Sequence, residues 1–491
     1  MTLDTFLLEV VLGAPIVAVL LLAFLGARLS RAAQTIAAAA SVLTLGAALG
    51  LSAMLYRGAD PTIAFAWIPA ANIEVRLHVD WLTLPFLVTE AAVTLAAILY
   101  SWGYHKTDTR SSYFYALLLL FGVGMSGTTL ADDLFLFYVF WELMLIASCA
   151  LILVWGEGEQ RGAVALKYFI FTHLGSLMVL VGLLVLYDAT GTDSLVALRA
   201  GGWTLAPGLV TTVLTLFFIG FSVKMAIFPL HLWLPDAHTV APMPVTIMLA
   251  AAMLSMGTYG ILRYPFSLFT VEQIAPFALP LMLAGLLSEV YGALMALAEK
   301  DIKRIIAYSS VSQMGYILFG LGTLTRTGIE GATLHVIYHA IVKALLFMVA
   351  GIIIRTTGRR NIEELGGLGR AMPWITGCAV IGALGIAGMP PLGIFNSEWM
   401  IFSGGFQTTH ILLSVLTLFA SLLTVVYALR FVGRIFIGEL PVGLTLHPIP
   451  RLMLVTTVVL TALLIIEGLF PAPLFDWTAH EITLLLGGAL P

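Results

Sequence analysis

The sequence predicts an all-α polytopic membrane protein with about fourteen transmembrane helices. Three observations predict this fold class: the composition, the repeated apolar runs and the distribution of basic residues. Hydrophobic residues make up 60% of the 491 residues and charged residues only 10%, whereas a soluble domain carries roughly 25% charged residues. Mean hydropathy is +1.03. Uninterrupted apolar runs of about 20 residues are typical of transmembrane helices and exclude the alternating pattern of a β-barrel.

The apolar runs place the expected spans along the chain. The spans lie near residues 5–27, 33–54, 80–101, 113–130, 133–155, 163–187, 209–230, 243–262, 276–298, 304–322, 332–354, 374–405, 410–433 and 452–471. The segment 55–79 is polar enough for an outer loop, and its β-branched residues allow a short hairpin. Prolines and glycines interrupt the runs 209–230 and 374–405, so we expect two broken helices.

The basic residues predict the orientation of the spans. With both termini outside, sixteen of the 23 basic residues fall in inner loops, and two, Lys224 and Lys343, fall inside spans. The outer side then carries five, namely Arg57, Arg76, Arg199, Arg263 and Arg326. This asymmetry follows the positive-inside rule. An odd number of spans would scramble it, so fourteen spans are favoured.

Several protein classes are disfavoured by what the sequence contains. No basic tract of the kind that binds nucleic acid is present, and no GxGxxG motif follows a strand. Cys149 and Cys378 lie inside apolar runs without the spacing of iron–sulfur ligands. We therefore expect no cofactor in this chain and no soluble redox domain within it.

Ionisable residues inside apolar runs are the first functional candidates, because a charge in the bilayer is costly. Glu142 lies about ten residues into its span, and Lys224 precedes Pro229 and Pro235 in the seventh span. A broken helix with an ionisable residue is typical of an ion site in transporters. The alternatives are a neutral, hydrogen-bonded acid at Glu142 and a lysine that reaches a surface at Lys224.

The eleventh span carries three titratable residues on one face. His335, His339 and Lys343 follow one another at four-residue spacing, which stacks their side chains along one side of a helix. Such a file suits a proton relay with intervening water. Core histidines with satisfied hydrogen bonds are the structural alternative. Haem ligation is disfavoured, because His173, His335 and His339 do not supply facing pairs of spans.

Two glutamates complete the intramembrane set. Glu398 follows the second predicted break, where Gly388, Pro390, Pro391 and Gly393 interrupt the apolar run. Glu289 lies in the middle of the ninth span. A loop-facing glutamate remains the alternative for Glu398.

The positions of the two breaks predict internal repetition. Spans four to eight and spans nine to thirteen each contain one broken helix, and units with an odd number of spans lie inverted in the membrane. The sequence therefore predicts two inverted five-helix repeats. The expected units are residues 1–109 with three spans and the outer loop 55–79, the first repeat at 110–263, the second repeat at 264–437, and a C-terminal span within 438–491.

The same stretches carry a family resemblance. The chain resembles the antiporter-like membrane subunits of complex I, nearest to the M-type chain, and their relatives. The matching stretches are FLFYVFWELMLI, KMAIFPLHLWLPDAHTVAPMPV, GTYGILRY, EKDIKRIIAYSSVSQMGY, HVIYHAIVKALLF and RNIEELGGLGRAMP. They are spread over about residues 80–435 and are specific for the superfamily more than for one member of it.

The resemblance implies a proton path and a role for each matching residue. Glu142 and Lys224 match the glutamate of the fifth span and the lysine of the seventh, His335 and Lys343 match the polar face of the eleventh, and Glu398 matches the acidic residue of M-type chains. One position departs from the family: the usual lysine of the eighth span is replaced by Ser255. A serine holds no charge, so we hypothesise that Glu289 or His238 supplies the missing titratable group.

The resulting expectation is a proton-translocating subunit of a complex-I-like NADH:quinone oxidoreductase. Its expected partners are other antiporter-like membrane subunits and a peripheral redox arm with flavin, iron–sulfur clusters and quinone. The alternatives are a membrane subunit of formate hydrogenlyase or an energy-converting hydrogenase, a Mrp-type sodium/proton antiporter subunit, and a stand-alone secondary transporter. The expected location is the cytoplasmic (inner) membrane of a bacterium or archaeon.

Overall fold

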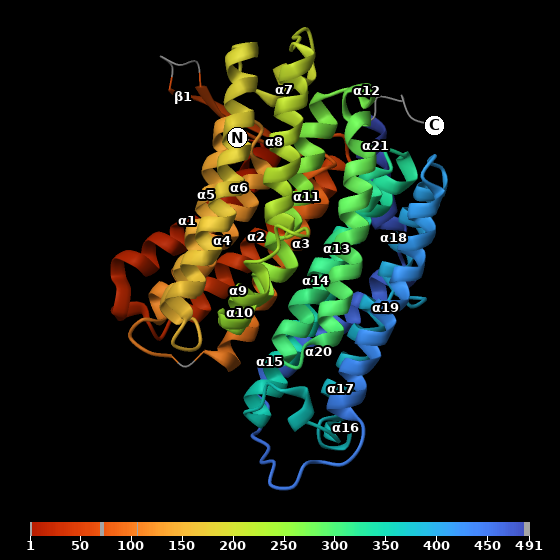
Figure 1. Ribbon diagram of the computed structural model, residues 1–491. Helices are drawn as coiled ribbons and strands as arrows, with labels where there is room; N and C mark the ends of the chain where they lie inside the picture. The colour runs from red at the N-terminus through yellow and green to blue at the C-terminus, as the bar shows by residue number, and fades with distance from the viewer. Residues whose placement is uncertain (1, 69–72, 106, 486–491) are drawn as a thin grey trace.

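The helices form one elongated bundle, in which the long ones run roughly parallel or antiparallel to one another (Figure 1). The structure is a computed structural model that describes residues 2–68, 73–105 and 107–485. Within that part of the chain, 13 helices are long and apolar enough to cross a membrane. The pair α17 (Pro373–Ile386) and α18 (Gly393–Phe406) adds one broken crossing, which agrees with the fourteen spans expected from the sequence.

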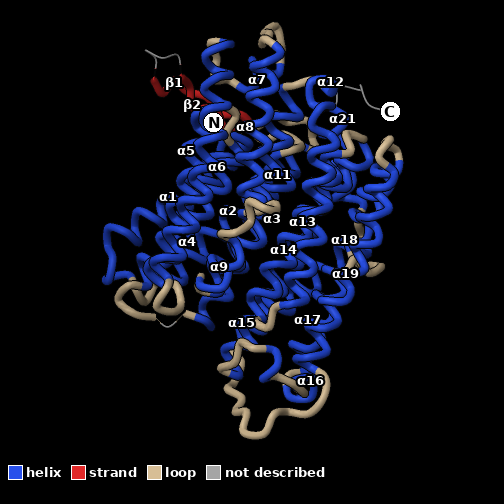
Figure 2. The backbone as a smooth tube through the Cα atoms, viewed as in Figure 1, coloured by secondary structure: helices blue, strands red, loops and turns tan. Residues whose placement is uncertain are grey.

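The two ends of the bundle differ in their loops. We call one the hairpin end, where α1 begins, the strands lie and α21 packs. The other is the basic end, with the loops around residues 26–32, 299–301 and 358–372 (Figure 1). Figure 2 shows loops gathered mainly at these two ends, with both strands at one of them. Of the sixteen basic residues assigned to inner loops, Lys106 lies outside the described residues.

The first three long helices and a hairpin form the N-terminal part. They are α1 (Leu3–Leu25), followed by the short turn η1 (Gly26–Leu29), α2 (Ala33–Leu55) and α3 (Thr83–Tyr104). The strands β1 (Thr62–Ile68) and β2 (Ile73–His78) pair antiparallel, with Thr62 opposite His78. The hairpin expected within 55–79 is therefore present, although residues 69–72 lie outside the described chain.

Spans four to eight follow with the first broken helix. The elements are α4 (Ser111–Leu130), α5 (Leu134–Trp155), α6 (Arg161–Thr190), α7 (Leu195–Arg199), α8 (Pro207–Met225) and α9 (Leu234–Val240). The eighth span is continuous but irregular, with α10 (Met243–Met248), the π-helical turn η3 (Leu249–Met253), α11 (Ser255–Ile261) and the π-helical turn η4 (Leu262–Phe266). Figure 2 shows the break between α8 and α9 as a loop in the middle of the bundle.

Spans nine to thirteen run in the opposite sense, from the hairpin end. The elements are α12 (Val271–Ile274), η5 (Ala275–Phe277), α13 (Ala278–Ala298), α14 (Ile302–Gly322), α15 (Arg326–Thr357), η6 (Ile362–Glu364), α16 (Leu368–Ala371), α17 (Pro373–Ile386), α18 (Gly393–Phe406) and α19 (Ile411–Phe436). Helix α15 packs on α18 as α6 packs on α8. Both breaks predicted from proline and glycine are thus present, one in each series of five spans.

The C-terminal part contains the last span and one element that the sequence did not suggest. Helix α20 (Arg451–Leu469) is the expected fourteenth span, and α21 (Ala472–Leu485) follows it. Helix α21 packs against α3 and α15, with the His480 ring 4.7 Å from that of Trp81. A short amphipathic helix at a surface has a weaker sequence signal than a span.

Helices α14 and α15 and the eighth span form the centre of the bundle. Helix α14 and the span Met243–Phe266 are buried along their whole apolar windows, and α15 is buried along nearly all of its own. By contrast, only a third of the corresponding windows of α1 and α19 are buried. The lipid-facing helices are thus the outer ones, and the polar residues of the central helices are shielded from lipid.

Ion pairs at the basic end join the two series of five spans. Glu157, after α5, lies 3.4 Å from the Lys303 ammonium and 3.3 Å from the Arg360 guanidinium. Asp236, on α9, pairs with Lys167 at 2.8 Å and with Arg304 at 2.9 Å. The first broken helix is therefore fastened to α14 through its acidic residue.

Candidate functional site

The first group of polar side chains surrounds the break in α8. Lys224 is the second-last residue of α8 and is buried. Its Nζ lies 5.1 Å from the centre of the Trp141 ring and interacts electrostatically with Glu142. In the described part of the chain this Nζ has no hydrogen-bond partner. The lysine thus faces the glutamate of α5 without a fixed contact, which leaves their separation free to change.

Helix α6 supplies a partner for Glu142 that the sequence did not single out. The Nδ1 atom of His173 lies 3.1 Å from Oε2 of Glu142. Glu142 is a carboxylate between a histidine on α6 and a lysine on α8, whereas the sequence assigned it only the lysine. Both of these partners come from neighbouring helices, and Tyr138 of α5 interacts with the same carboxyl.

Two residues, Ala226 and Trp233, determine the course of the backbone at this break. Ala226, the residue after α8, adopts left-handed backbone angles with φ 56°, which non-glycine residues rarely adopt. Because the helix stops there, carbonyls of its last turn lack helical donors. The Val223 carbonyl accepts hydrogen bonds from the Ala226 amide at 3.1 Å and from the Trp233 indole at 3.0 Å.

The three titratable residues of α15 are all completely buried, as their shared helix face implied. The Lys343 ammonium donates to the Ile306 carbonyl at 3.0 Å and to the Ser309 hydroxyl. His335 lies between Gln313, 2.9 Å from its Nε2, and Ser397, 3.0 Å from its Nδ1. Neither ring nitrogen of His339 has a hydrogen-bond partner in the described chain.

His238 links the first broken helix to α15. It lies on α9, is completely buried, and interacts electrostatically with Lys343 and Lys303. Its ring lies 6.4 Å from that of Trp233 and 5.7 Å from that of Phe347. The histidine therefore stands between the α8 break and the lysine of α15.

Glu398 and Glu289 form a second acidic group at the other break. Both are buried, and their carboxyl groups interact electrostatically with each other and with Tyr316. Glu398 packs against the break itself, because a Cβ atom on Gly388 would approach its Oε2 within 2.1 Å. Gly388 also has φ 62°, so both the space and the backbone require glycine at this position.

Side chains of α14 and α19 connect Lys343 with this acidic group. Tyr427 interacts with Ser309, with Gln313 and with Glu398. Ser309 is hydrogen-bonded to Lys343, and Gln313 is hydrogen-bonded to His335. Buried polar groups therefore line the region between the lysine of α15 and the glutamate after the second break.

Neither hypothetical substitute lines the cavity beside Ser255. A small cavity beside Ser255 is lined by residues of α3, α11 and α15 and of the turn η3, and neither Glu289 nor His238 is among them. Glu289 instead joins Glu398, and His238 joins Lys343. The cavity beside Ser255 therefore has its own set of lining residues, apart from these two interactions.

The position of Glu289 leads to a prediction of its own. Glu289→Gln is expected to lower proton translocation by the assembled complex, because it removes one of the two interacting glutamates of the acidic group at the second break. Translocation is measured as pH change in sealed vesicles. Glu272→Gln is the control, since Glu272 is exposed on α12. Unchanged translocation in Glu289→Gln would exclude this residue from the path.

Other intramembrane acids and amides were missed by the sequence interpretation. Glu90 on α3 and Glu467 on α20 lie within apolar runs, so the reasoning that selected Glu142 also applies to them. Gln313 and His173 carry no such signal, because they become informative only through the helices that pack beside them. Among the described residues, no three His, Cys, Asp or Glu side chains gather closely enough to hold a metal ion.

Family models match most of this architecture. The model described as NADH:quinone oxidoreductase/Mrp antiporter matches residues 131–424, which include both breaks. The model described as the N-terminus of chain 5 of NADH-ubiquinone oxidoreductase (complex I) matches residues 67–115.

Individual relatives agree with these models. Subunit M of the NADH-quinone oxidoreductase of Escherichia coli (strain K12) is 34% identical over 426 residues, which cover 84% of this chain and 83% of the relative. A chain 4 of the NAD(P)H-quinone oxidoreductase of Synechococcus sp. (strain JA-3-3Ab) is 33% identical over 441 residues, covering 87% and 83%.

Solved structures share the fold along nearly the whole length. A chain of respiratory complex I from Thermus thermophilus matches with a TM-score of 0.86 and 25% identity, covering 98% of this chain and 99% of that one. A chain of an archaeal membrane-bound sulfane sulfur reductase matches with 0.88 and 26%, covering 98% and 97%. For a chain of the Mrp complex from Dietzia sp. DQ12-45-1b the values are 0.89 and 22%, covering 99% and 98%, a likeness of fold alone.

The family model covers more than half of the chain, and the relatives share a third of their residues over most of its length. The two broken helices lie inside the matched region, as do the buried polar groups described above except Tyr427, which follows it. The chain is a multi-span membrane protein that belongs to the NADH:quinone oxidoreductase/Mrp antiporter family of membrane subunits.

Proposed function

We propose that this chain carries protons across the membrane as the M-type subunit of a complex-I-like NADH:quinone oxidoreductase. The observation that supports this most is the set of buried titratable groups, with Glu142 and Lys224 at the first break and Lys343, His335 and Glu398 towards the second. Burying so many ionisable groups in a membrane bundle is costly, so their presence favours a role in transport. The 34% identity to a subunit M further favours this member of the family.

In the proposed mechanism, Glu142 and Lys224 form a coupled pair. The proton affinity of each group depends on the charge of the other and on their separation. A proton enters from the basic end, passes by water and the His335, His339 and Lys343 face, and leaves near Glu398. Redox chemistry in partner subunits changes the charge state of the pair, and this chain itself transfers no electrons.

The proposal assigns the rest of the assembly to other chains. Flavin, iron–sulfur clusters and quinone belong to a peripheral redox arm and its neighbours, and further antiporter-like subunits lie beside this chain in the membrane. The proposed units are residues 1–109, the repeats 110–263 and 264–437, and 438–491. Both termini are proposed to lie outside, with the basic end at the cytoplasmic face of the inner membrane.

A second candidate is a membrane subunit of formate hydrogenlyase or of an energy-converting hydrogenase. The 26% identity to a chain of the sulfane sulfur reductase, an archaeal respiratory membrane complex, over 98% of this chain favours a respiratory complex of another kind than the NADH-linked one. A Mrp-type antiporter subunit that moves Na⁺ against protons is the third candidate, and it requires no redox partner.

Purification of the tagged chain in mild detergent, followed by mass spectrometry of what accompanies it, tests these candidates. Flavin and iron–sulfur subunits together with a quinone-site chain are the expected result. A nickel-containing subunit would transfer the chain to the hydrogenase-like complexes. Small membrane chains without any redox subunit would contradict the proposal in favour of the antiporter.

A further inference from the structure

Glu90 is a buried carboxylic acid that the proposed path does not use. It lies in the middle of α3 with an exposed fraction of 1%. Its Oε1 accepts a hydrogen bond from the Thr129 hydroxyl at 3.0 Å, and Ser126 lies close to the same carboxyl. Its Oε2 has no hydrogen-bond partner in the described part of the chain. An unsatisfied buried carboxyl oxygen calls for water or for a proton.

A small cavity adjoins the carboxyl on the side of the eighth span. Its volume is about 10 Å³, and its lining includes Glu90, Thr89 and Ser255. A cavity of roughly this size holds one water molecule when polar groups line it. The Ser255 hydroxyl donates to the Ala251 carbonyl at 3.1 Å and keeps its lone pairs for such a water. Glu90 is the titratable residue among those that line this cavity.

The backbone of the eighth span is widened at the same place. The π-helical turn η3 ends two residues before Ser255, and η4 follows α11. Single π-helical turns within α-helices occur frequently at functional sites. The widening and the cavity coincide, so the helix is irregular where it faces Glu90.

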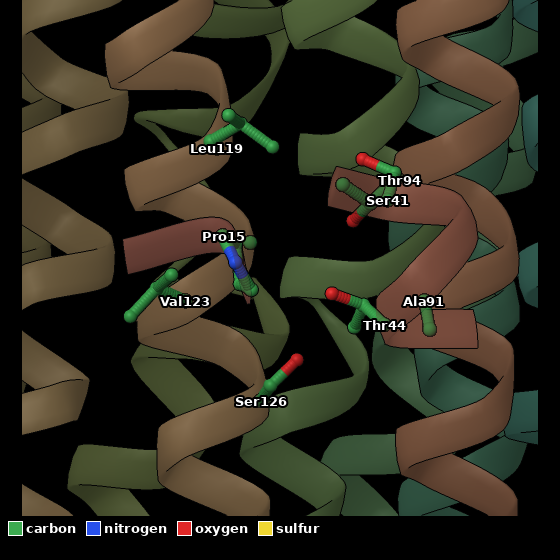
Figure 3. Close-up of a pocket in the computed structure, with 9 residues that line it drawn as sticks. Pro15, Ser41, Thr44, Ala91, Thr94, Leu119, Val123 and Ser126 are labelled. Carbon is green, nitrogen blue, oxygen red and sulfur yellow. The ribbon is translucent and has the colours of Figure 1, made fainter. Parts of the chain in front are cut away.

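A second cavity of about 10 Å³ lies on the other side of Glu90, between α1, α2, α3 and α4. Figure 3 shows Thr44 and Ser126 pointing toward it from opposite sides, with Ser41 and Thr94 beside them. Thr94 is one helical turn from Glu90 on α3, and Ser126 approaches the carboxyl itself. The Ser41 hydroxyl has no hydrogen-bond partner within the described residues. Hydroxyl groups therefore lead from this cavity to the acid.

We propose that Glu90 is a proton-carrying group that takes the place of the lysine absent at Ser255. The neutral acid gives its proton to a water in one cavity, and the carboxylate takes a proton from a water in the other, so that no net charge stays on the side chain. This inference rests on the proposed function. It places the missing titratable group on α3 rather than on the eighth span or at either residue considered from the sequence.

The competing view is that Glu90 is a neutral acid that only satisfies Thr129. A glutamine would serve that purpose equally well, because its carbonyl oxygen accepts the same hydrogen bond while its amide cannot release a proton. The exchange of Glu90 for glutamine therefore separates a structural role from proton transfer.

The test uses the whole complex in sealed vesicles, with proton translocation measured per electron transferred. Glu90→Gln is compared with wild type and with Glu142→Gln. We expect Glu90→Gln to assemble normally and to lose translocation to the level of Glu142→Gln. Ser255→Lys in the Glu90→Gln background is expected to recover part of the loss, because it restores a titratable group to the same cavity.

Each other result has a definite meaning. Wild-type translocation in Glu90→Gln, beside a loss in Glu142→Gln, would overturn the role of Glu90 and leave the proposed function standing. Wild-type translocation in both variants would overturn the proposed function itself. If Glu90→Gln does not assemble, the role of Glu90 is tested by infrared spectra of Glu90→Asp recorded during turnover. A carboxylic acid band that differs from that of wild type supports the inference. A spectrum identical to that of wild type refutes it.

Discussion

Replacing Glu142 by glutamine is expected to abolish proton translocation through this subunit. Electron transfer by the whole complex falls less sharply or becomes uncoupled, because no redox group is assigned to this chain. Loss of a positioned proton-transfer group lowers a rate by about 10²–10⁴-fold, and we expect a loss of at least the smaller value. The measurement is the ratio of protons moved to electrons transferred in sealed vesicles.

The expected effect follows from the surroundings of Glu142. Its carboxyl interacts electrostatically with the Lys224 ammonium, and its Oε2 lies 3.1 Å from Nδ1 of His173. Glutamine keeps the size and one acceptor but cannot be charged. Lys224 then remains buried without a counter-charge, and its proton affinity no longer responds to movement of α5. The coupled pair is reduced to a single group.

A matched control separates this effect from a general effect of removing a glutamate. Glu159→Gln makes the same chemical change at an exposed position in the loop after α5, and it is expected to leave translocation unchanged. Glu142→Asp keeps the charge and is expected to retain part of the activity. Full translocation in Glu142→Gln would contradict the proposed mechanism.

The sequence was sufficient to predict the spans, both breaks and most of the buried titratable groups. The reason is physical: a membrane chain must satisfy its backbone within helices, so each span leaves a long apolar run. Proline and glycine interrupt those runs visibly, as at Pro229 and Gly388. A charged residue such as Lys224 stands out against the run for the same reason.

The sequence could not predict which groups meet across helices. His173 beside Glu142, and Gln313 between His335 and Tyr427, depend on the packing of separate helices. Glu90 is the clearest example, because only the fold shows that it lines the same cavity as Ser255. Likewise, only the fold shows that Glu289 interacts with Glu398 and that His238 interacts with Lys343.

Replacing Asp80 by asparagine is expected to cause the largest loss of stability. Asp80 lies just before α3 at the hairpin end, and its two oxygens meet the two terminal nitrogens of Arg263 at 2.5 and 2.8 Å. The Arg263 side chain is only 2% exposed. Removing one partner of a buried ion pair leaves an uncompensated charge and costs about 3–5 kcal/mol. A lower thermal midpoint of the purified protein in detergent is the measurement.

Hydrogen bonds connect the same ion pair with residues in the interior of the bundle. Arg263 also donates to the Tyr259 hydroxyl at 2.8 Å, and Tyr259 donates to the Thr129 carbonyl at 2.6 Å. Thr129 is the residue that holds Glu90. Loosening Asp80 is therefore expected to weaken the packing of α3 against α4 and α11 as well as the outer surface.

The pH dependence of this loss identifies the ion pair as its cause. Burial alone would raise the pKa of Asp80, but Arg263 and Arg199 outweigh it and hold the pKa well below its ordinary value. A carboxyl with a depressed folded-state pKa contributes stability that is complete above its unfolded pKa, about 3.9, and is lost as the pH falls through the folded value.

The difference in thermal midpoint between wild type and Asp80→Asn should therefore stay constant from pH 7 to about pH 5 and narrow only in stronger acid. Asp60→Asn is the control, because the Asp60 side chain is 83% exposed and its ion-pair partner within the described residues is His78. Surface changes usually alter stability by no more than about 0.5 kcal/mol. An Asp80→Asn protein as stable as Asp60→Asn would show that Arg263 finds other compensation and that the pair does not hold the hairpin end together.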